Sequence, residues 1–206
     1  NKDFTGTPDP AKVVAKDTNG TKVETTYTPT VTPVVPTAEP KETKDVQGAT
    51  QTGKPTFTPG ADEVPMDDDT PATFEDGSKE KVIPGEGTYT VAPDGTVTFV
   101  PEKTFTGTGT GVTVKRVDKN GTPVTAKYTP TVLPATPTAT PAETTDIQGA
   151  LQKGLPQFLG GRVSVDGVQK IVPIDETKPL ELIDPSTGKV TNEIVVPGEG
   201  TYTVYN

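Results

Sequence analysis

Alternating apolar and polar residues form the clearest pattern in this chain and predict short β-strands. In residues 88–91 (TYTV) and 96–100 (TVTFV), tyrosine, phenylalanine and valine alternate with threonine. A period of two places successive side chains on opposite faces of a strand. We therefore expect the aromatic and valine side chains of each segment to share one face and the threonines to point outward. Prolines and glycines interrupt every window that otherwise suits a helix, so no helix is predicted.

Turn-forming residues separate these segments at short intervals. Ala-Pro-Asp-Gly at 92–95 joins the two strands above, and Asn-Gly at 120–121 separates the strand-like residues 111–118 from 122–132. Asn-Gly and Asp-Gly supply the left-handed backbone conformations that tight hairpins need, and Asn-Gly at 19–20 gives the same signal earlier in the chain. Several short strands joined by hairpins predict an all-β fold of small antiparallel β-sandwich-like repeat domains.

The chain repeats itself with a period of about 100 residues. At an offset of 101 positions, residues 17–60 match residues 118–161 with 26 identities in 44 positions. At PGEGTYTV (84–91 and 197–204) the offset has grown to 113, so the second copy carries about 12 additional residues within 162–194. The period is too long for a solenoid unit and is typical of bead-like domains in tandem.

Proline-rich segments divide the repeats. Residues 31–45 and 132–146 are rich in proline and poor in large side chains, and proline favours the extended geometry of semi-rigid linkers. The sequence predicts the back part of one repeat (1–31), a Pro-rich linker (32–45), a complete repeat (46–131), a second linker (132–146) and the front part of a third repeat (147–206) with a variant insert (162–194). The chain is expected to be an excerpt of a longer array, with complementary parts of a repeat at its two ends.

Composition narrows the function. The apolar fraction is 30%, below the usual range for soluble domains, so we expect a small core and marginal stability in each repeat. The net charge of −9 argues against nucleic acid and against an anionic membrane, since no basic surface is available to contact phosphates. Cysteine, a long apolar run and a signal peptide are absent, so for an exported protein the targeting segments are expected outside these residues.

The residues that most enzymes use for catalysis are scarce. The chain has no histidine and no cysteine, which excludes histidine-based triads, cysteine nucleophiles and the common zinc ligands. Its serines, Ser78, Ser164 and Ser186, lie in turn-like or strand-edge sequence. Paired carboxylates can hydrolyse glycosides, but a sugar-binding cleft also needs aromatic walls, and aromatic residues make up 5% of the chain. We predict no enzyme, no catalytic or cofactor-binding residues and no cofactor.

Two motifs suggest a ligand site at first sight. PGEG at 84–87 and 197–200 resembles a phosphate loop, but such loops need a helix N-terminus after the glycines; because these residues precede a strand, a tight turn that starts a hairpin is favoured. Residues 61–77 carry seven carboxylates, enough to bind Ca²⁺. Their spacing differs from that of an EF-hand, and the second copy replaces the whole segment. A solvated acidic loop is the favoured interpretation, calcium binding is the alternative, and no metal ligand is assigned.

The asparagines offer one covalent possibility. Four of the five lie in hairpin turns or at the chain ends, which leaves Asn192, beside Glu193. This asparagine is the sole candidate for a lysine–asparagine isopeptide bond of the kind that locks the domains of cell-wall adhesins. An intact mass without the loss of ammonia would dismiss it.

The repeated motifs also resemble a known family. VQGATQTGKPTFTPG (46–60) and the stretch 85–132, with YTVAPDGTVTF, FTGT and YTPTV, are similar to the CshA-type fibril repeat of Gram-positive cell-wall-anchored surface adhesins. The resemblance covers essentially the whole chain as one full and two partial repeats. It implies β-rich repeats stacked into a fibril on the cell wall, a separate non-repetitive region that does most of the ligand binding, and a C-terminal sorting signal outside these residues. The segment 162–194 departs from the pattern and leaves the strand order of its repeat open.

The sequence and this resemblance together predict a structural role, as stalk repeats of a bacterial surface fibril that project an adhesive tip from the cell wall. The alternative is that the repeats themselves bind a host protein or glycan, through an exposed strand edge or the acidic loop. Expected partners are neighbouring repeats of the fibril and, in the alternative, host extracellular-matrix or salivary proteins, with no nucleic acid and no membrane. The expected location is extracellular, at the cell surface, with cell-wall attachment through segments outside these residues.

Overall fold

The computed structural model describes residues 1–205, which form β-strands joined by turns, with no helix among them. This part of the chain accordingly offers no helix long and apolar enough to cross a membrane. The chain divides into two compact units, one formed by residues 1–134 with 163–168 and the other by residues 135–162 with 169 onward. The prediction of an all-β fold with small antiparallel sheets is confirmed.

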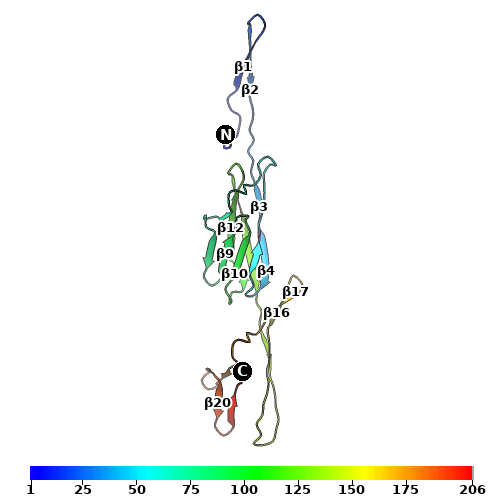
Figure 1. The fold of residues 1–206 in the computed structure, drawn as a ribbon, viewed down its shortest axis with the longest axis vertical. Coiled ribbons are helices and arrows are strands. Elements are labelled where there is room, and N and C mark those ends of the chain that lie inside the picture. Colours follow the sequence, from blue (N-terminus) through cyan, green and yellow to red (C-terminus); the bar gives the residue numbers. More distant parts are fainter. Residues whose placement is uncertain (206) are drawn as a thin grey trace. The chain divides into compact units, whose positions relative to one another are not determined.

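A β-sandwich forms the centre of the first unit (Figure 1). The strands of its first sheet follow the antiparallel order β5 (Gln51–Gly53), β10 (Val97–Pro101), β9 (Gly87–Val91) and β8 (Glu80–Ile83). β8 and β9 form one hairpin, β9 and β10 form the next, and β10 also pairs with β5. The predicted turn at 92–95 joins β9 to β10.

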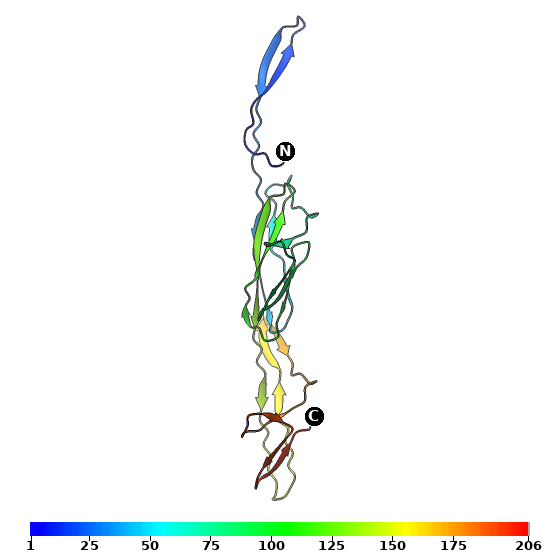
Figure 2. The same ribbon diagram turned by 90° about the vertical axis from the view of Figure 1, so that its left-hand side faces the viewer.

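The second sheet is built around its longest strand, β13 (Pro123–Leu133). β4 (Lys41–Val46) runs parallel to β13, as Figure 2 shows. The remaining strands are antiparallel, in the order β11 (Gly107–Thr108), β13, β12 (Val112–Val117) and β7 (Thr73–Phe74). Because Thr131 and Val132 pair with both β11 and β4, these two strands lie on opposite edges of β13.

Apolar side chains between the two sheets form the core. Tyr89 stacks on Phe99 with 4.5 Å between ring centroids and meets Tyr128 edge-on at 6.4 Å. Buried and partly exposed residues alternate along β9 and β10, which confirms the predicted alternation of core side chains and threonines. The other buried members of the cluster are Ala72, Phe74, Val91, Val97, Val112, Val114 and Val132.

Both predicted Asn-Gly hairpins form. At the turn between β12 and β13, Asp118 Oδ1 accepts the N–H groups of Asn120 and Thr122 at 2.9 and 2.8 Å. Gly121 has a φ of +83°, the left-handed conformation that the turn was predicted to need. The turn at 17–21 repeats these bonds and joins the strands of the N-terminal hairpin.

The second half of the segment predicted as a linker, 32–45, contains β-strands in the structure. β3 (Thr37–Glu39) pairs with β6 (Thr56–Thr58), and β4 extends the second sheet. The sequence of β4, KETKDV, resembles a linker because β4 is an edge strand, on which charged side chains reach solvent. The central domain therefore begins before residue 46 and includes β13 to its end at Leu133.

The segments outside the sandwich form two-stranded hairpins. β1 (Ala11–Lys16) pairs with β2 (Lys22–Tyr27), and β14 (Thr138–Thr140), inside the second predicted linker, pairs with β15 (Gln157–Leu159). The remaining hairpins are β16 (Gly161–Val165) with β17 (Val168–Val172) and β18 (Leu182–Ile183) with β19 (Val190–Thr191), which occupy the variant insert, and β20 (Glu193–Val196) with β21 (Gly200–Thr203).

Replacing Phe99 by alanine is expected to lower the free energy of unfolding of the sandwich by about 3–5 kcal/mol, because the fully buried ring leaves a cavity between its aromatic neighbours. Val100 is half exposed on the opposite face of β10. Val100→Thr is therefore the matched control, with an expected change below about 0.5 kcal/mol. Urea unfolding followed by circular dichroism measures both variants, and equal losses would show that Phe99 is not a core residue.

Candidate functional site

The PGEG motif of the central repeat is the turn between β8 and β9. The N–H of Glu86 donates to Ile83 O at 3.0 Å, and β9 begins at the next residue. The prediction of a tight turn in a hairpin is confirmed. The sequence assigned no role to Glu86 itself, and here the structure adds one.

The carboxylate of Glu86 is buried where the two sheets meet, and the residue is 7% exposed. It accepts the main-chain N–H of Thr110 at 2.9 Å from each oxygen and the Thr110 hydroxyl at 2.8 Å. The hydroxyl of Tyr89 donates a further, short hydrogen bond. Glu86 and Tyr89 belong to the first sheet, and Thr110 lies between β11 and β12 of the second. We call Glu86, Tyr89 and Thr110 the carboxylate clamp, because they join the two sheets.

The hydrogen bonds of the clamp decide its protonation. Burial alone would raise the pKa of Glu86, but hydrogen bonds from Tyr89 and Thr110 favour the ionised form more strongly, so the pKa lies below its ordinary value of 4.5. Burial and the bond to the Glu86 carboxylate raise the pKa of Tyr89, which keeps the phenol a donor at neutral pH. The clamp is therefore an ionised acceptor surrounded by donors, a structural arrangement with no group ready to exchange protons with a substrate.

Two glycines allow the clamp to close. A Cβ atom at Gly109 would lie 2.6 Å from Tyr89 Oη and 2.9 Å from Glu86 Oε1, so a larger residue would displace the clamp. Gly111 has a φ of +74°, and a Cβ atom there would lie 2.4 Å from Tyr128 O. Both the backbone conformation and the available space therefore require glycine at this position.

A second polar cluster links β4 and β5 to β13. The Thr43 hydroxyl donates to Gln51 Oε1 at 2.7 Å and lies 2.8 Å from the Tyr128 hydroxyl. Gln51 Nε2 donates to Thr131 O at 2.9 Å. Burial raises the pKa of Tyr128, so this phenol also stays protonated. The cluster attaches the edge strand β4 to the sandwich through side chains as well as through the backbone.

The acidic segment 61–77 is tied to basic residues at the end of β12. Asp68 Oδ1 accepts Arg116 Nη2 at 2.7 Å, and Lys119 pairs with the aspartates on either side of Asp68. The hydrogen bond from Lys119 lowers the pKa of Asp67 to about 2. Within residues 1–205, no group of three or more acidic side chains is arranged to hold a metal ion. The three consecutive aspartates thus form an ion-paired loop.

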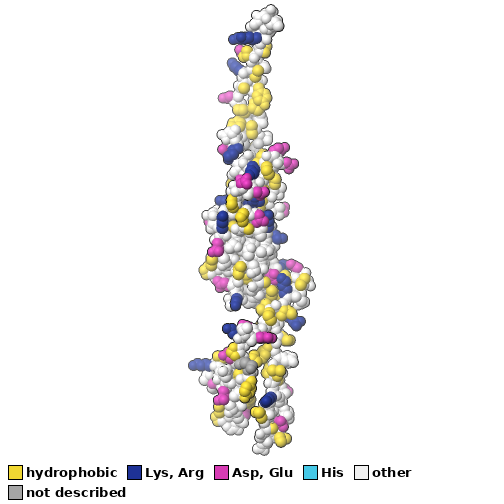
Figure 3. Space-filling view, in the orientation of Figure 1, with side chains coloured by type: hydrophobic (Ala, Val, Ile, Leu, Met, Phe, Trp, Pro, Cys, Tyr) yellow, Lys and Arg dark blue, Asp and Glu magenta, His cyan; other side chains and the backbone are white. Residues whose placement is uncertain are grey.

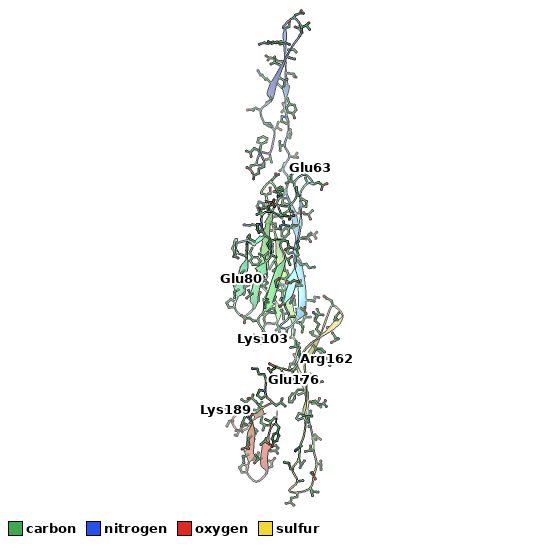
Figure 4. The ribbon with its side chains drawn as sticks, in the orientation of Figure 1. Glu63, Glu80, Lys103, Arg162, Glu176 and Lys189 are labelled. Carbon is green, nitrogen blue, oxygen red and sulfur yellow. The ribbon has the colours of Figure 1, made fainter. Side chains whose placement is uncertain are left out.

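The remaining charges are dispersed over the surface. Acidic and basic side chains are interspersed on the face of the central sandwich that Figure 3 shows, and much of that face is neither charged nor apolar. Glu63 lies toward one end of the sandwich and Lys103 at the other, and Glu80 projects from its side (Figure 4). This face presents mixed charge rather than a patch of one sign.

The structure places the other candidate residues at the surface. The hydroxyls of Ser78 and Ser186 each donate to the aspartate two positions earlier, at 2.6 and 2.7 Å, which are turn contacts. Ser164 is exposed on β16. Asn192 and Glu193 are exposed as well, and an isopeptide bond at Asn192 stays a prediction.

The sequence did carry a signal for the clamp. Glutamate occurs three residues before tyrosine in both copies of PGEGTY, and Tyr202 donates to Glu199 as Tyr89 donates to Glu86. A glutamate between two glycines is typical of an exposed turn, so its burial could not be inferred from this segment. Its partner on the second sheet is 24 residues away.

Short, mostly antiparallel strands, held together in the central sandwich by two buried polar clusters, define a structural repeat module. The family model of the surface adhesin CshA repetitive domain matches residues 1–31, 33–132 and 134–206. The chain belongs to this family of surface-adhesin repeats, which is not enzymatic and whose place is the cell surface. The middle repeat matches at 33–132, and the positions of β3 and β4 agree with a start in the proline-rich segment.

Two solved structures resemble parts of the chain. The NMR structure of repeat domain 13 of the fibrillar adhesin CshA from Streptococcus gordonii is 67% identical and covers 34% of this chain and 90% of that one, with a TM-score of 0.21. Its sequence identity supports the family, and the TM-score carries no argument. The N-terminal eight Ig domains of Down Syndrome Cell Adhesion Molecule cover 76% of this chain and 26% of theirs at 13% identity and a TM-score of 0.35, which carries no argument either. A search of curated protein sequences gave no match.

Replacing Glu86 by glutamine is expected to lower the free energy of unfolding by about 1–3 kcal/mol at neutral pH, because buried donors lose an ionised acceptor. The folded pKa of Glu86 is lowered, so its contribution is fully present above the unfolded value of 4.5 and is lost as pH falls through the folded pKa. The difference between wild type and variant should therefore shrink below pH 4.5.

Urea unfolding across this pH range measures that difference. Glu80→Gln is the control, since Glu80 is exposed on the neighbouring strand β8. A penalty for Glu86→Gln that stays constant into the acid range would contradict a role for the ionised carboxylate.

Proposed function

We propose that the chain is a load-bearing stalk segment of a bacterial surface fibril, which holds an adhesive tip away from the cell wall. The observation that carries this proposal is the parallel pairing of β4 with β13, the strands by which the chain enters and leaves the second sheet of the central repeat. Cell-wall attachment through segments outside these residues, and neighbouring repeats as the main partners, belong to the same proposal.

The ladder between β4 and β13 is oriented to resist a pull along the chain. It runs over six residue pairs, from Lys41 with Tyr128 to Val46 with Leu133. The chain enters β4 at Lys41 and leaves β13 at Leu133, at opposite ends of the ladder. Tension on the two flanking segments would slide the strands past each other, so that all the hydrogen bonds share the load. The same strands pulled apart at one end would lose these bonds one at a time.

Other contacts strengthen the same junction. The N–H of Gln47 donates to Leu133 O at 2.8 Å, directly beyond the last residue pair of the ladder. The Thr43–Tyr128 contact crosses the ladder, and Gln51 connects it to the first sheet. Sliding β4 along β13 would therefore break side-chain as well as backbone hydrogen bonds.

The alternative function, binding of a host protein or glycan by the repeats, receives no support from the acidic loop. Its three consecutive aspartates already pair with Arg116 and Lys119. A ligand for these carboxylates would have to compete with ion pairs inside the same domain.

Single-molecule force spectroscopy with two pulling directions tests the load-bearing role. The chain has no cysteine, so introduced pairs attach at defined positions. The pair Pro33→Cys and Pro134→Cys loads the ladder in shear, and the pair Lys41→Cys and Lys127→Cys opens it from one end. We expect a clearly higher rupture force in shear, with equal urea stability of the two variants as the control. A shear rupture force equal to or below the opening force would refute the proposal.

A further inference from the structure

A small pocket lies beside the turn at 92–95 in the central sandwich. It has a volume of about 250 Å³, and the residues that line it are Lys54, Pro55, Thr56, Phe57 and Arg116. A Cβ atom at Gly95 in this turn would lie 3.4 Å from Phe57 Cε2 and 3.6 Å from Arg116 Cδ, so the turn supports two of the walls. Within residues 1–205, the charged side chains that line the pocket are both cations.

Arg116 brings a buried charge to this pocket. Its side chain is 7% exposed, on the core-facing side of β12, and its guanidinium carbon lies 6.0 Å from the centroid of the Phe57 ring. Nη2 donates to Asp67 O at 3.3 Å and to Asp68 Oδ1 at 2.7 Å. Nε is buried and has no hydrogen-bond partner within residues 1–205. A buried donor without a partner costs free energy, so an acceptor that a ligand supplies to this guanidinium stabilises it.

Lys54 supplies the second cation. Its half-exposed side chain pairs with Asp94 at 3.1 Å, and an exposed ion pair of this kind contributes little to stability. Asp94 also accepts the N–H and the hydroxyl of Thr96, at 3.0 and 2.9 Å. The carboxylate therefore keeps two partners when Lys54 turns toward a ligand. Because an ammonium group has three donors, Lys54 can also contact a ligand without leaving Asp94.

Each of these cations is replaced by an uncharged residue in a neighbouring repeat. Leu155 stands 101 positions after Lys54, and Ala15 stands 101 positions before Arg116. The aromatic residue of the pocket does recur, as Phe158. The repeat pattern thus accepts uncharged residues at both positions, which sets the two cations apart from the features that build the sandwich. A role in binding accounts for a pair of cations that the fold does not need.

We propose that this pocket binds a saccharide that carries a carboxylate or a sulfate group. The anionic group accepts hydrogen bonds from Lys54 and Arg116, and the C–H face of the sugar ring packs on Phe57. The pocket is smaller than the usual sites of drug-sized ligands, which suits one sugar ring rather than a folded partner protein. Its residues differ from those of the ladder between β4 and β13, so this binding does not rest on the load-bearing role.

An NMR titration tests the proposal on the isotope-labelled full chain. Methyl β-D-glucuronide is the carboxylate probe, methyl β-D-glucoside 6-sulfate is the sulfate probe, and methyl β-D-glucoside is the matched neutral sugar. We expect saturable shifts at residues 54–57 and at the Arg116 Nε–H, with the exposed Arg162, the other arginine of the chain, as the internal reference. The neutral sugar should bind at least about tenfold more weakly, since it lacks the charged acceptor. The tighter of the two anionic probes identifies the group that the site takes.

Substitutions borrowed from the neighbouring repeats provide the second measurement. Arg116→Ala is expected to raise the Kd of the tighter probe about tenfold, through the loss of a buried charged donor. Lys54→Leu should raise it about threefold, because Lys54 is half exposed. Lys103→Leu removes the same charge at the end of the sandwich opposite Glu63 and should leave the Kd unchanged (Figure 4). Urea unfolding verifies that each variant is folded, and Lys54→Leu, an exposed change, tests the site even where Arg116→Ala lowers stability.

Four results would overturn the proposal. The first is the absence of saturable shifts with both anionic probes, and the second is equal binding of the charged and neutral sugars. The third is an equal loss of affinity in Lys54→Leu and Lys103→Leu, which would reflect the net charge of the chain rather than a site. The fourth is equal binding of N-acetylglutamate amide, which carries a carboxylate without a sugar ring and would indicate an acidic segment of a protein as the ligand.

Discussion

The two sheets of the central repeat meet around a buried carboxylate, and the geometry of that contact constrains everything near it. A buried charge is tolerated when donors surround it, and Glu86 is surrounded by Tyr89 and Thr110 from opposite sheets. Satisfying it requires the β8–β9 turn, the segment before β12 and the glycines at 109 and 111 to be in register. In a chain with an apolar fraction of 30%, this polar contact supplies specificity that a small core supplies less well.

In the proposed load-bearing role, the edge strand β4 would give a repeat with a small core resistance to a pull along the chain. Its side chains are mostly charged and exposed, so it adds little apolar burial. Its backbone, however, pairs with the final strand over the whole length of β4, and Thr43 joins it to Tyr128 and Gln51. In the proposed load-bearing role, strength along the chain would come from the direction of this hydrogen-bond ladder and would depend little on the amount of buried surface.

The carboxylate clamp is formed partly by contacts within one hairpin turn and partly by a contact with the other sheet. The pair of glutamate and tyrosine forms in both copies of PGEGTY, since residues three apart in a hairpin turn meet without help from the rest of the fold. Closure onto Thr110 occurs in the central repeat because it needs another sheet. Burial of this motif in the central repeat therefore depends on the second sheet and does not follow from the motif itself.

The sequence by itself determined the features that depend on neighbouring residues. Alternation at 88–100 predicted which side chains form the core, and Asn-Gly at 120–121 predicted a hairpin, because strand faces and tight turns follow from local backbone geometry. The tertiary structure alone decided what depends on distant partners. Residues 41–46 have the composition of a linker but form a strand that pairs with residues 128–133. Glu86 lies between two glycines, as in an exposed turn, but its carboxylate is buried and accepts hydrogen bonds from Thr110 of the other sheet. Contacts between segments far apart in the sequence produce no repeating pattern within either segment. Neither β4 nor Glu86 therefore shows, in its own sequence, that it has a partner elsewhere in the chain.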